Sequence, residues 1–235
     1  MPMNPRLLRP LASGFSPKTI SGLALWLDAP EYNASTGTWA DKSGNGRNFD
    51  QEIAANRPIV SAVTQNGRAI LEFDGSNDQL IHNTNFLQVP DCTLFSAFRR
   101  VGGTFGGVIT SASVAGASDR SPGILIDSFR GAIRGFGNLS VATAGSVDSF
   151  NITSGTVTNG ASVIFTNGTQ IDSDAASTTL DTGNTITAIG TYRTETGNHL
   201  NGYIGEIIVY TRVLTVSERK RVEGYLGKKW GITVA

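Results

Sequence analysis

Residues 23–27 read Leu-Ala-Leu-Trp-Leu, a short apolar run that ends at an aspartate. Comparable runs recur at 92–98, which reads Cys-Thr-Leu-Phe-Ser-Ala-Phe, and at 203–210, which reads Tyr-Ile-Gly-Glu-Ile-Ile-Val-Tyr. Short apolar runs bounded by turn residues are typical of buried β-strands rather than helices. These three segments therefore predict strands that cross the core of a β protein.

Turn signals separate these runs from many others along the chain. Asn-Gly pairs fall at 66–67, 159–160, 167–168 and 201–202. Asn-Gly accepts a positive φ at both central positions of a type I′ turn, so each pair predicts a β-hairpin. About ten or more short strands without helices between them predict an antiparallel sandwich or barrel. Residues 140–160 fit either strands with polar outer faces or long loops.

The last twenty residues are the exception, because they predict a helix. Thr215 and Glu218 fit a capping box. An apolar stripe follows at helical spacing, formed by Val222, Tyr225, Leu226 and Trp230. Arg219, Lys220 and Arg221 are expected to point into solvent, and Lys228 and Lys229 lie where the helix dipole favours cations.

Composition excludes several classes of function. The chain of 235 residues has 19 basic and 19 acidic residues, so we expect no nucleic-acid partner. Its one cysteine, Cys92, allows no disulfide within the chain and is predicted to be a small buried apolar residue. No run approaches the roughly 20 apolar residues of a membrane span. No signal peptide is recognised, so we expect a protein that stays in the cytoplasm or leaves as part of an assembly made there.

Residues 1–18 differ from the rest of the chain. Four prolines oppose helix, and the basic residues meet no acid before Asp28. This composition predicts an extended arm, which is either a disordered tail or a segment that docks on a neighbouring subunit. The residues expected to make such a contact are Arg6, Leu7, Leu8, Arg9 and Leu11. Residues 19–235 are then the folded domain.

Four stretches in order resemble the laminin-G-like branch of the concanavalin A-like lectin/glucanase superfamily. Residues 20–29 are similar to its first strand, and residues 39–48 to its W-x-D-x-S-G-N-G turn. Residues 66–78 contain its L-x-F-D-G-x-x-D strand and loop. Residues 202–232 are similar to its closing strand and C-terminal helix. The resemblance implies an antiparallel β-sandwich jelly roll with one C-terminal amphipathic helix.

The first fifteen residues carry a second resemblance, to small virion proteins of tailed bacteriophages that contain this domain. That resemblance implies a structural role in a virion rather than catalysis.

The carboxylates are the candidates for a catalytic role. Glycosidases of the superfamily place closely spaced acids on one strand, and only Glu72 and Asp74 fit. Alternation puts both on one face, but the next positions on that face hold no further acid. His82 and His199 lie in polar contexts without a metal-binding cluster. We therefore predict no catalytic residue and no enzyme.

Loop side chains remain as candidate ligands. Asp41, Asn45, Asp74, Asn77 and Asp78 are predicted to bind a sugar or calcium at one rim, as members of the resembled family do, with calcium as an alternative at Asp74 and Asp78. The competing interpretation is that Asp and Asn before Gly simply form turns. Trp26 and Trp39 fit either a sugar-stacking surface or the core.

Two functions follow from these expectations. The first is a non-catalytic bacteriophage virion protein, a head decoration or fibre-type subunit that attaches through its arm to other virion proteins, with a homotrimer as the expected assembly. The alternative is a lectin-like module that binds host surface glycans. Neither hypothesis requires a cofactor other than the candidate calcium ion.

Overall fold

The structure of the chain is a computed structural model, which describes residues 14–103, 105–112, 122–127, 130–134, 140–146, 148–158, 161–175, 185–192 and 198–235. The strands are β1 (Leu23–Asn33), β2 (Thr38–Asp41), β3 (Phe49–Asp50), β4 (Ile59–Gln65), β5 (Arg68–Asp74), β6 (Leu80–His82), β7 (Asp91–Gly102), β8 (Phe105–Ala112), β9 (Gly123–Asp127), β10 (Arg130–Arg134), β11 (Ser140–Ser146), β12 (Asn151–Thr158), β13 (Ser162–Thr166), β14 (Thr169–Asp174), β15 (Ile186–Ile189) and β16 (Asn201–Tyr210). One α-helix, α1 (Val216–Trp230), and two 3-10 turns at Pro17–Thr19 and Ala54–Asn56 complete the described elements.

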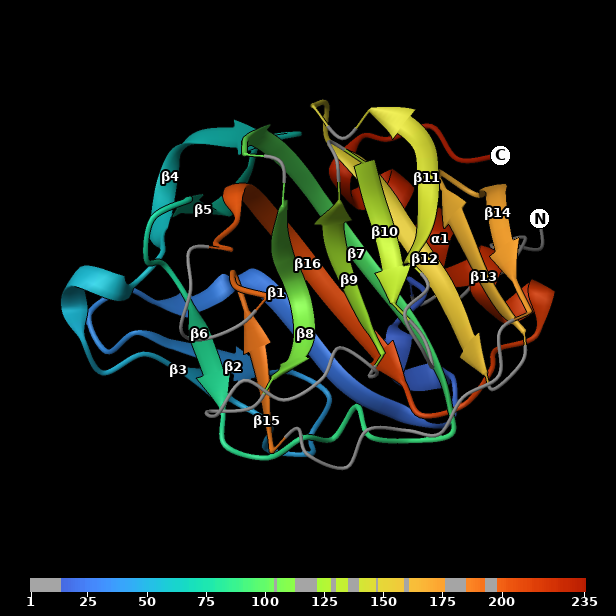
Figure 1. The fold of residues 1–235 in the computed structure, drawn as a ribbon, viewed down its shortest axis with the longest axis horizontal. Coiled ribbons are helices and arrows are strands. Elements are labelled where there is room, and N and C mark those ends of the chain that lie inside the picture. The colour runs from blue at the N-terminus through green and yellow to red at the C-terminus, as the bar shows by residue number, and fades with distance from the viewer. Residues whose placement is uncertain are drawn as a thin grey trace, which may run out of the picture.

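The strands form two stacked layers (Figure 1). The front layer contains β6, β15, β8, β9, β10 and β11, and the rear layer contains β1, β16, β7, β12, β13 and β14, both in hydrogen-bonded order. β3 and β2 connect the two layers, because β6 pairs with β3, β3 with β2 and β2 with β1. β5 pairs with β16, and β4 pairs with β5. The described pairs are antiparallel, so the predicted antiparallel β-sandwich with one C-terminal helix is confirmed.

The centre of the rear layer, at β16 and β7, is buried on both faces. Leu25, Phe98 and Ile207 belong to the core between the layers. Phe95 and Ile208 belong to a second core, which lies between the outer face and α1. Successive residues of a strand point to opposite faces, so two cores require apolar residues at consecutive positions. This is why β1, β7 and β16 contain consecutive apolar residues rather than a strict alternation of apolar and polar ones.

A bulge at Gly205 lets the helix approach the sheet. Ile204 pairs with Phe98 and Glu206 pairs with Ala97, so Gly205 is the extra residue on β16. The ring of Trp230 lies against it, and a Cβ atom at this position would come within 2.8 Å of that ring. Only glycine leaves room for this packing.

Two of the four predicted hairpins are confirmed. Asn66-Gly67 joins β4 to β5 and Asn167-Gly168 joins β13 to β14, all with positive φ. The pair at 159–160 lies outside the described residues. The hairpin predicted at 201–202 is wrong, because these residues begin β16. Gly202 is needed there for another reason: a Cβ atom would meet the backbone oxygen of Arg99 at 2.3 Å.

The predicted helix and its capping box are confirmed. The amide of Glu218 donates to Thr215 Oγ1 at 3.3 Å, and the amide of Thr215 donates to Glu218 Oε2 at 2.9 Å. Val222, Leu226 and Trp230 of the apolar stripe are buried, and Tyr225 is half-buried. The stripe therefore sets which side of α1 faces the sheet.

One prediction about the helix is wrong. Lys220 and Arg221 are exposed as expected, but Arg219 is buried. Its guanidinium lies 3.6 Å from the ring centroid of Phe165 and forms a 2.5 Å ion pair with Glu223. The rear layer extends under this side of the helix, so a charged residue one turn from the cap needs a partner there.

The segment before β1 packs on the domain from residue 15 onward. The ring of Phe15 lies 5.8 Å from that of Tyr225, and the hydroxyl of Tyr210 donates to the carbonyl of Pro17 at 2.9 Å. The expected boundary at residue 18 falls inside this packed segment. The five arm residues Arg6, Leu7, Leu8, Arg9 and Leu11 lie outside the described residues.

The remaining expectations concern single segments. Within 140–160 the strand alternative is correct, because β11 and β12 occupy most of it. Cys92 is buried and free, and Trp39 is fully buried in the inter-layer core. No helix among the described residues has the length and hydropathy to cross a bilayer.

The Gly205 bulge gives a stability prediction. Gly205→Ala should lower the free energy of unfolding by about 1–3 kcal/mol, because the added methyl group overpacks against the Trp230 ring. Urea denaturation monitored by tryptophan fluorescence measures this. Gly224→Ala is the matched control, since Gly224 is an exposed helical glycine with nothing within 4 Å of its Cβ position. The control should be stabilised by up to about 1 kcal/mol; equal effects in both variants would contradict the account.

Candidate functional site

The predicted ligands Asp41 and Asn45 are engaged within their own turn. Asp41 Oδ1 accepts the amide of Ser43 at 2.8 Å, and its Oδ2 accepts the amide of Arg47 at 3.1 Å. The side-chain amide of Asn45 donates to two carbonyl oxygens of β1 at 2.9 and 3.1 Å. Both residues fasten the turn to the first strand. The geometry matches the turn-forming alternative.

The 74–78 turn is built in the same way, but one of its carboxylates stays accessible. Asp74 Oδ1 accepts the amides of Ser76 at 2.8 Å and Asn77 at 3.2 Å. Asp78 Oδ2 accepts the amide of Asp74 at 2.9 Å. Asp78 is buried with 6% of its surface exposed, whereas Asp74 and Asn77 are exposed. Asp74 therefore both organises the turn and faces solvent.

The two aspartates have opposite electrostatic environments. Burial raises the pKa of Asp78 to about 6, the bond from the Asp74 amide opposes this, and the charges of Asp74 and Glu72 add to it. Partial burial also acts to raise the pKa of Asp74, but the amides of Ser76, Asn77 and Asp78 outweigh it and hold that pKa below its usual value. Asp74 is thus ionised over a wide pH range.

No group of three or more His, Cys, Asp or Glu side chains in the described ranges is placed to hold a metal ion. The alternative of calcium at Asp74 and Asp78 therefore stays a prediction.

A pocket of about 230 Å³ lies beside Asp74, where β5, β16 and β7 meet. Its polar lining comes from Glu72, Asp74 and Asn201, and Val101 and Tyr203 contribute apolar surface. Asn201 on β16 pairs directly with Asp74 on β5. The side chain of Val101, at the end of β7, is 55% exposed. We call this the rim pocket. It brings together the two carboxylates that the sequence singled out and adds an amide and an aromatic ring.

Neighbouring strands hold the rim pocket in shape. Glu72, Tyr203 and Arg99 lie opposite one another on β5, β16 and β7. The guanidinium carbon of Arg99 lies 4.6 Å from the centroid of the Tyr203 ring, and Ser61 donates to Glu72 Oε2 at 2.8 Å. Three strands therefore fix the positions of the lining side chains. Side chains carried on strands are positioned more precisely than side chains carried on loops.

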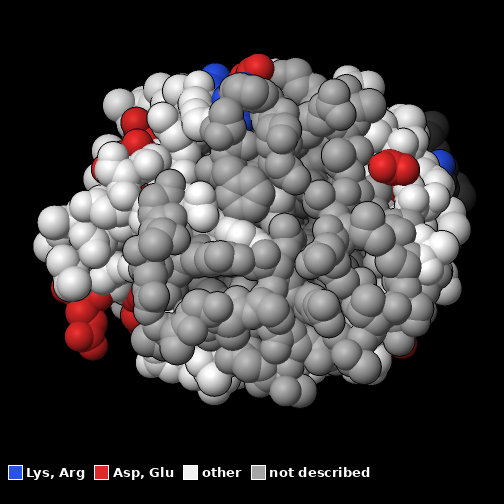
Figure 2. All heavy atoms as spheres, in the orientation of Figure 1, with Lys and Arg blue, Asp and Glu red and all other residues white. Residues whose placement is uncertain are grey.

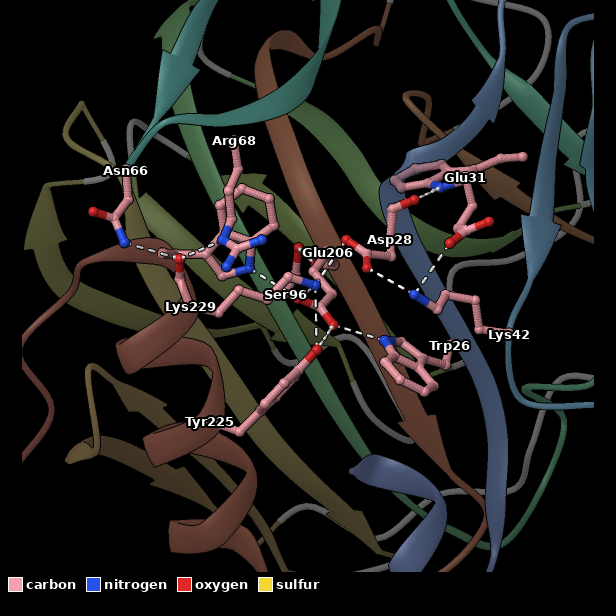
Figure 3. Close-up of polar contacts among 12 residues, drawn as sticks. Trp26, Asp28, Glu31, Lys42, Asn66, Arg68, Ser96, Glu206, Tyr225 and Lys229 are labelled. Atoms are coloured by element: carbon pink, nitrogen blue, oxygen red, sulfur yellow. Dashed lines mark hydrogen bonds and ion pairs between the residues drawn. The ribbon is translucent and has the colours of Figure 1, made fainter. Parts of the chain in front are cut away.

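A second polar cluster, missed by the sequence analysis, is centred on Glu206 (Figure 3). Glu206 is fully buried between the rear layer and α1. Its Oε1 accepts from Trp26 Nε1 at 2.6 Å and from the Tyr225 hydroxyl at 2.8 Å. Its Oε2 accepts from Trp230 Nε1 at 2.9 Å and forms a 2.8 Å ion pair with Lys229. Strands β1 and β16 and the helix thus meet at one carboxylate.

The charge on Glu206 is balanced by a chain of ion pairs that leads to the surface. Lys229 also contacts Asp28 at 2.8 Å, Asp28 contacts Lys42 at 3.0 Å, and Lys42 contacts Glu31 at 3.2 Å (Figure 3). Burial raises the pKa of Glu206 and the ammonium of Lys229 opposes the rise. The four donors around Glu206 suit a carboxylate, which only accepts.

The Glu206 cluster is a structural anchor rather than a binding site. Both of its carboxylate oxygens are engaged by protein donors, and Glu206 does not line the rim pocket. The sequence did contain a signal, since Glu206 is an acid within the apolar run 203–210. A lone carboxylate in a buried strand requires partners.

Known proteins share the fold of the chain but not its sequence. No family model and no curated sequence matches it. A sialidase of Trypanosoma rangeli, solved with a difluoro-KDN ligand, is 14% identical with a TM-score of 0.64, and the match covers 91% of this chain and 34% of the sialidase. The binding domain of Paraclostridial Mosquitocidal Protein 1 is 14% identical with a TM-score of 0.64, covering 90% of this chain and 55% of that one.

The binding domain of Botulinum Neurotoxin DC, solved in complex with SialylT, is 14% identical with a TM-score of 0.59, covering 88% of this chain and 52% of that domain. The chain therefore spans about a third of the sialidase and about half of the toxin domains. At such low identity these likenesses establish a shared all-β fold.

The raised pKa of Asp78 predicts how stability depends on pH. A carboxyl whose pKa is higher in the folded protein than in the unfolded chain stabilises the fold at low pH, and this contribution is lost as pH rises from about 4 through about 6. Asp78→Asn keeps an oxygen for the amide of Asp74 and removes the buried charge. The variant should be more stable than the parent at pH 7.5 and equally stable at pH 4. Urea titrations at both pH values measure this, and a variant that is less stable at pH 7.5 would contradict the assignment.

Proposed function

We propose that the chain is a non-catalytic carbohydrate-binding domain and that its rim pocket takes one residue of a glycan. The observation that carries the proposal is the composition of the pocket. Glu72 and Asp74 offer acceptors, Asn201 offers both donors and an acceptor, and Val101 and Tyr203 offer apolar surface. Sugar rings carry hydroxyl groups that donate and accept, and apolar C–H faces. The pocket of about 230 Å³ is smaller than the roughly 300–1,000 Å³ of pockets for drug-sized ligands, which suits a ligand no larger than one sugar ring.

The charges in the rim pocket favour binding over hydrolysis. A glycosidase needs a protonated acid beside its second carboxylate, and enzymes obtain it by raising one pKa. The exposed Asp74 has a lowered pKa, and Asp78, whose pKa is raised, is buried in the turn and does not line the pocket. This arrangement supports a pocket that recognises a sugar without cleaving it.

The structural likenesses are consistent with sugar recognition. The solved structures include a sialidase in complex with sialic acid and a toxin binding domain in complex with SialylT. A fold that recurs in proteins solved with sugars makes a glycan the first ligand class to test. It does not identify the sugar.

A virion structural role is the second candidate function. It is favoured by residues 1–13, whose prolines, leucines and arginines suit an arm that joins the domain to a neighbouring subunit. In that case the partners are other virion proteins, the protein is located in a virion as a homo-oligomer, and glycan binding is its receptor-recognition activity. The two candidates are compatible, because an arm and a pocket are separate parts of the chain.

Removing the pocket amide tests the first proposal. A glycan array followed by titration calorimetry on the best ligand gives the affinity of the full chain. Asn201→Ala should weaken binding about tenfold, the equivalent of one net hydrogen bond of about 1.4 kcal/mol. The matched control is Gln170→Ala, which removes an exposed amide from β14, outside the rim pocket, and should leave the affinity unchanged.

Two results would overturn the proposal. One is the absence of any glycan ligand on the array for the folded protein. The other is equal affinity of the parent and Asn201→Ala for the ligand that is found.

Calcium provides an independent test of the pocket chemistry. We expect glycan affinity and melting temperature to be the same in 5 mM calcium and in excess EDTA, because protein amides already engage Asp74 and Asp78. A rise in melting temperature with calcium that Asp74→Asn abolishes would instead establish the calcium alternative.

A further inference from the structure

The side chain of Asn66, in the turn between β4 and β5, contacts the end of α1 (Figure 3). Its Nδ2 donates to the carbonyl of Lys229 at 3.1 Å, and Arg68 Nε donates to the same oxygen at 3.1 Å. Gln65 Nε2 donates to the carbonyl of Trp230 at 2.7 Å. The last carbonyls of a helix have no partner within the helix. The β4–β5 turn therefore caps the C-terminal end of α1.

The residue after Asn66 is Gly67, and this pair of residues can react with itself. Asparagine is a thermolabile residue, and it deamidates when the backbone nitrogen of the next residue attacks its Cγ. The Cγ–Nδ2 bond breaks, ammonia leaves with the proton of the attacking amide, and a five-membered succinimide forms. Water then opens the ring at either carbonyl, which leaves an aspartyl or an isoaspartyl residue. Glycine favours the attack, because it has no Cβ atom to restrict its backbone.

The surroundings of Asn66 and Gly67 leave room for this reaction. Both residues are exposed, and the position of a Cβ atom on Gly67 has nothing within 4 Å. The amide of Gly67 makes no hydrogen bond to another described residue, so its nitrogen is free to attack. Within the described part of the chain, one hydrogen bond holds the Asn66 side chain. A single bond must therefore break before the ring can form.

The other described Asn-Gly pairs, at 45–46, 167–168 and 201–202, are held more firmly. The side-chain amide of Asn45 donates to two carbonyl oxygens of β1 and to Ser43 Oγ, at 2.9 to 3.1 Å. Asn167 Oδ1 accepts the amide of Ile152 at 2.8 Å. Asn201 is paired with β5 on one side and β7 on the other. Each of these pairs must open more of the structure before it can react.

We propose that Asn66 is a site of spontaneous deamidation and that the reaction loosens the end of α1. The carboxylate that replaces the amide only accepts hydrogen bonds, so it cannot donate to the carbonyl of Lys229. It also places a negative charge at the C-terminal end of the helix, where the dipole is already negative. Arg68 keeps its bond to the same carbonyl, so the cap is weakened rather than removed.

The position of this cap connects an exposed turn to the buried carboxylate of Glu206. Lys229 and Trp230, whose carbonyls the turn caps, both contact Glu206 through their side chains. Figure 2 shows both acidic and basic atoms at the upper edge of the molecule, where Figure 1 places the end of β4. One further carboxylate leaves this edge mixed in charge, so we expect the reaction to act through the lost hydrogen bond.

Peptide mapping of the full chain after incubation in H₂¹⁸O at mildly alkaline pH tests the site. The peptide that contains residues 66–67 should take up ¹⁸O at least about tenfold faster than the other three, because they must open first. In urea, where the chain is unfolded, the four pairs should react at similar rates. The proposal is overturned if the four pairs also react at similar rates in the folded protein, or if another pair reacts faster than 66–67.

Hydrogen–deuterium exchange on Asn66→Asp tests the consequence, because this variant carries the carboxylate from the start. The amides of residues 226–230 should exchange about fivefold faster than in the parent, as expected for the loss of one net hydrogen bond. The matched control is Gln170→Glu, which adds the same charge at an exposed position of β14 and should exchange like the parent. Parent-like exchange in Asn66→Asp, or equal acceleration in Gln170→Glu, would refute the link to the helix.

Discussion

The buried carboxylate of Glu206 is the constraint on which the rest of the structure depends. A lone ionised group inside an apolar sheet is strongly destabilising unless donors surround it. Trp26, Tyr225, Lys229 and Trp230 supply those donors, and they come from the first strand and the last helix. Both β1 and α1 must therefore lie against β16 before the carboxylate of Glu206 has its hydrogen-bond donors. Only the native arrangement achieves this, so the anchor selects the position of α1 on the sheet as well as holding it.

The two halves of β16, on either side of Gly205, have different surroundings. Its second half is covered by the helix, and the Gly205 bulge lets Trp230 settle beside Glu206. Its first half, at Asn201 and Tyr203, pairs with β5 and β7 and forms the wall of the rim pocket. The bulge lies between these halves. The same strand thus carries the buried carboxylate that contacts the helix and the groups proposed to bind a sugar.

Much of the fold was predictable because it follows from local patterns. Apolar runs gave the strands of the rear layer, Asn66-Gly67 and Asn167-Gly168 gave two turns, and Thr215 with Glu218 gave the start of the helix. What could not be predicted depends on distant residues. Asn201-Gly202 has a turn signature but is pinned between two strands, and Arg219 has the pattern of a solvated residue but meets Phe165. Part of the rim pocket could be predicted, because Glu72 and Asp74 lie two residues apart on one strand, whereas Val101 and Asn201 reach them only through strand pairing.

Hydrogen–deuterium exchange on Glu206→Gln tests the central claim most directly. Glutamine keeps the size of the side chain, but its amide nitrogen turns a donor toward the donors of Trp26, Tyr225, Trp230 and Lys229. If Glu206 anchors the helix, amides of residues 216–230 and 203–206 should exchange at least about tenfold faster than in the parent, while those of β12 and β13 keep more of their protection. Unchanged exchange in residues 216–230 would contradict the account, because the helix would then be held by its apolar face alone.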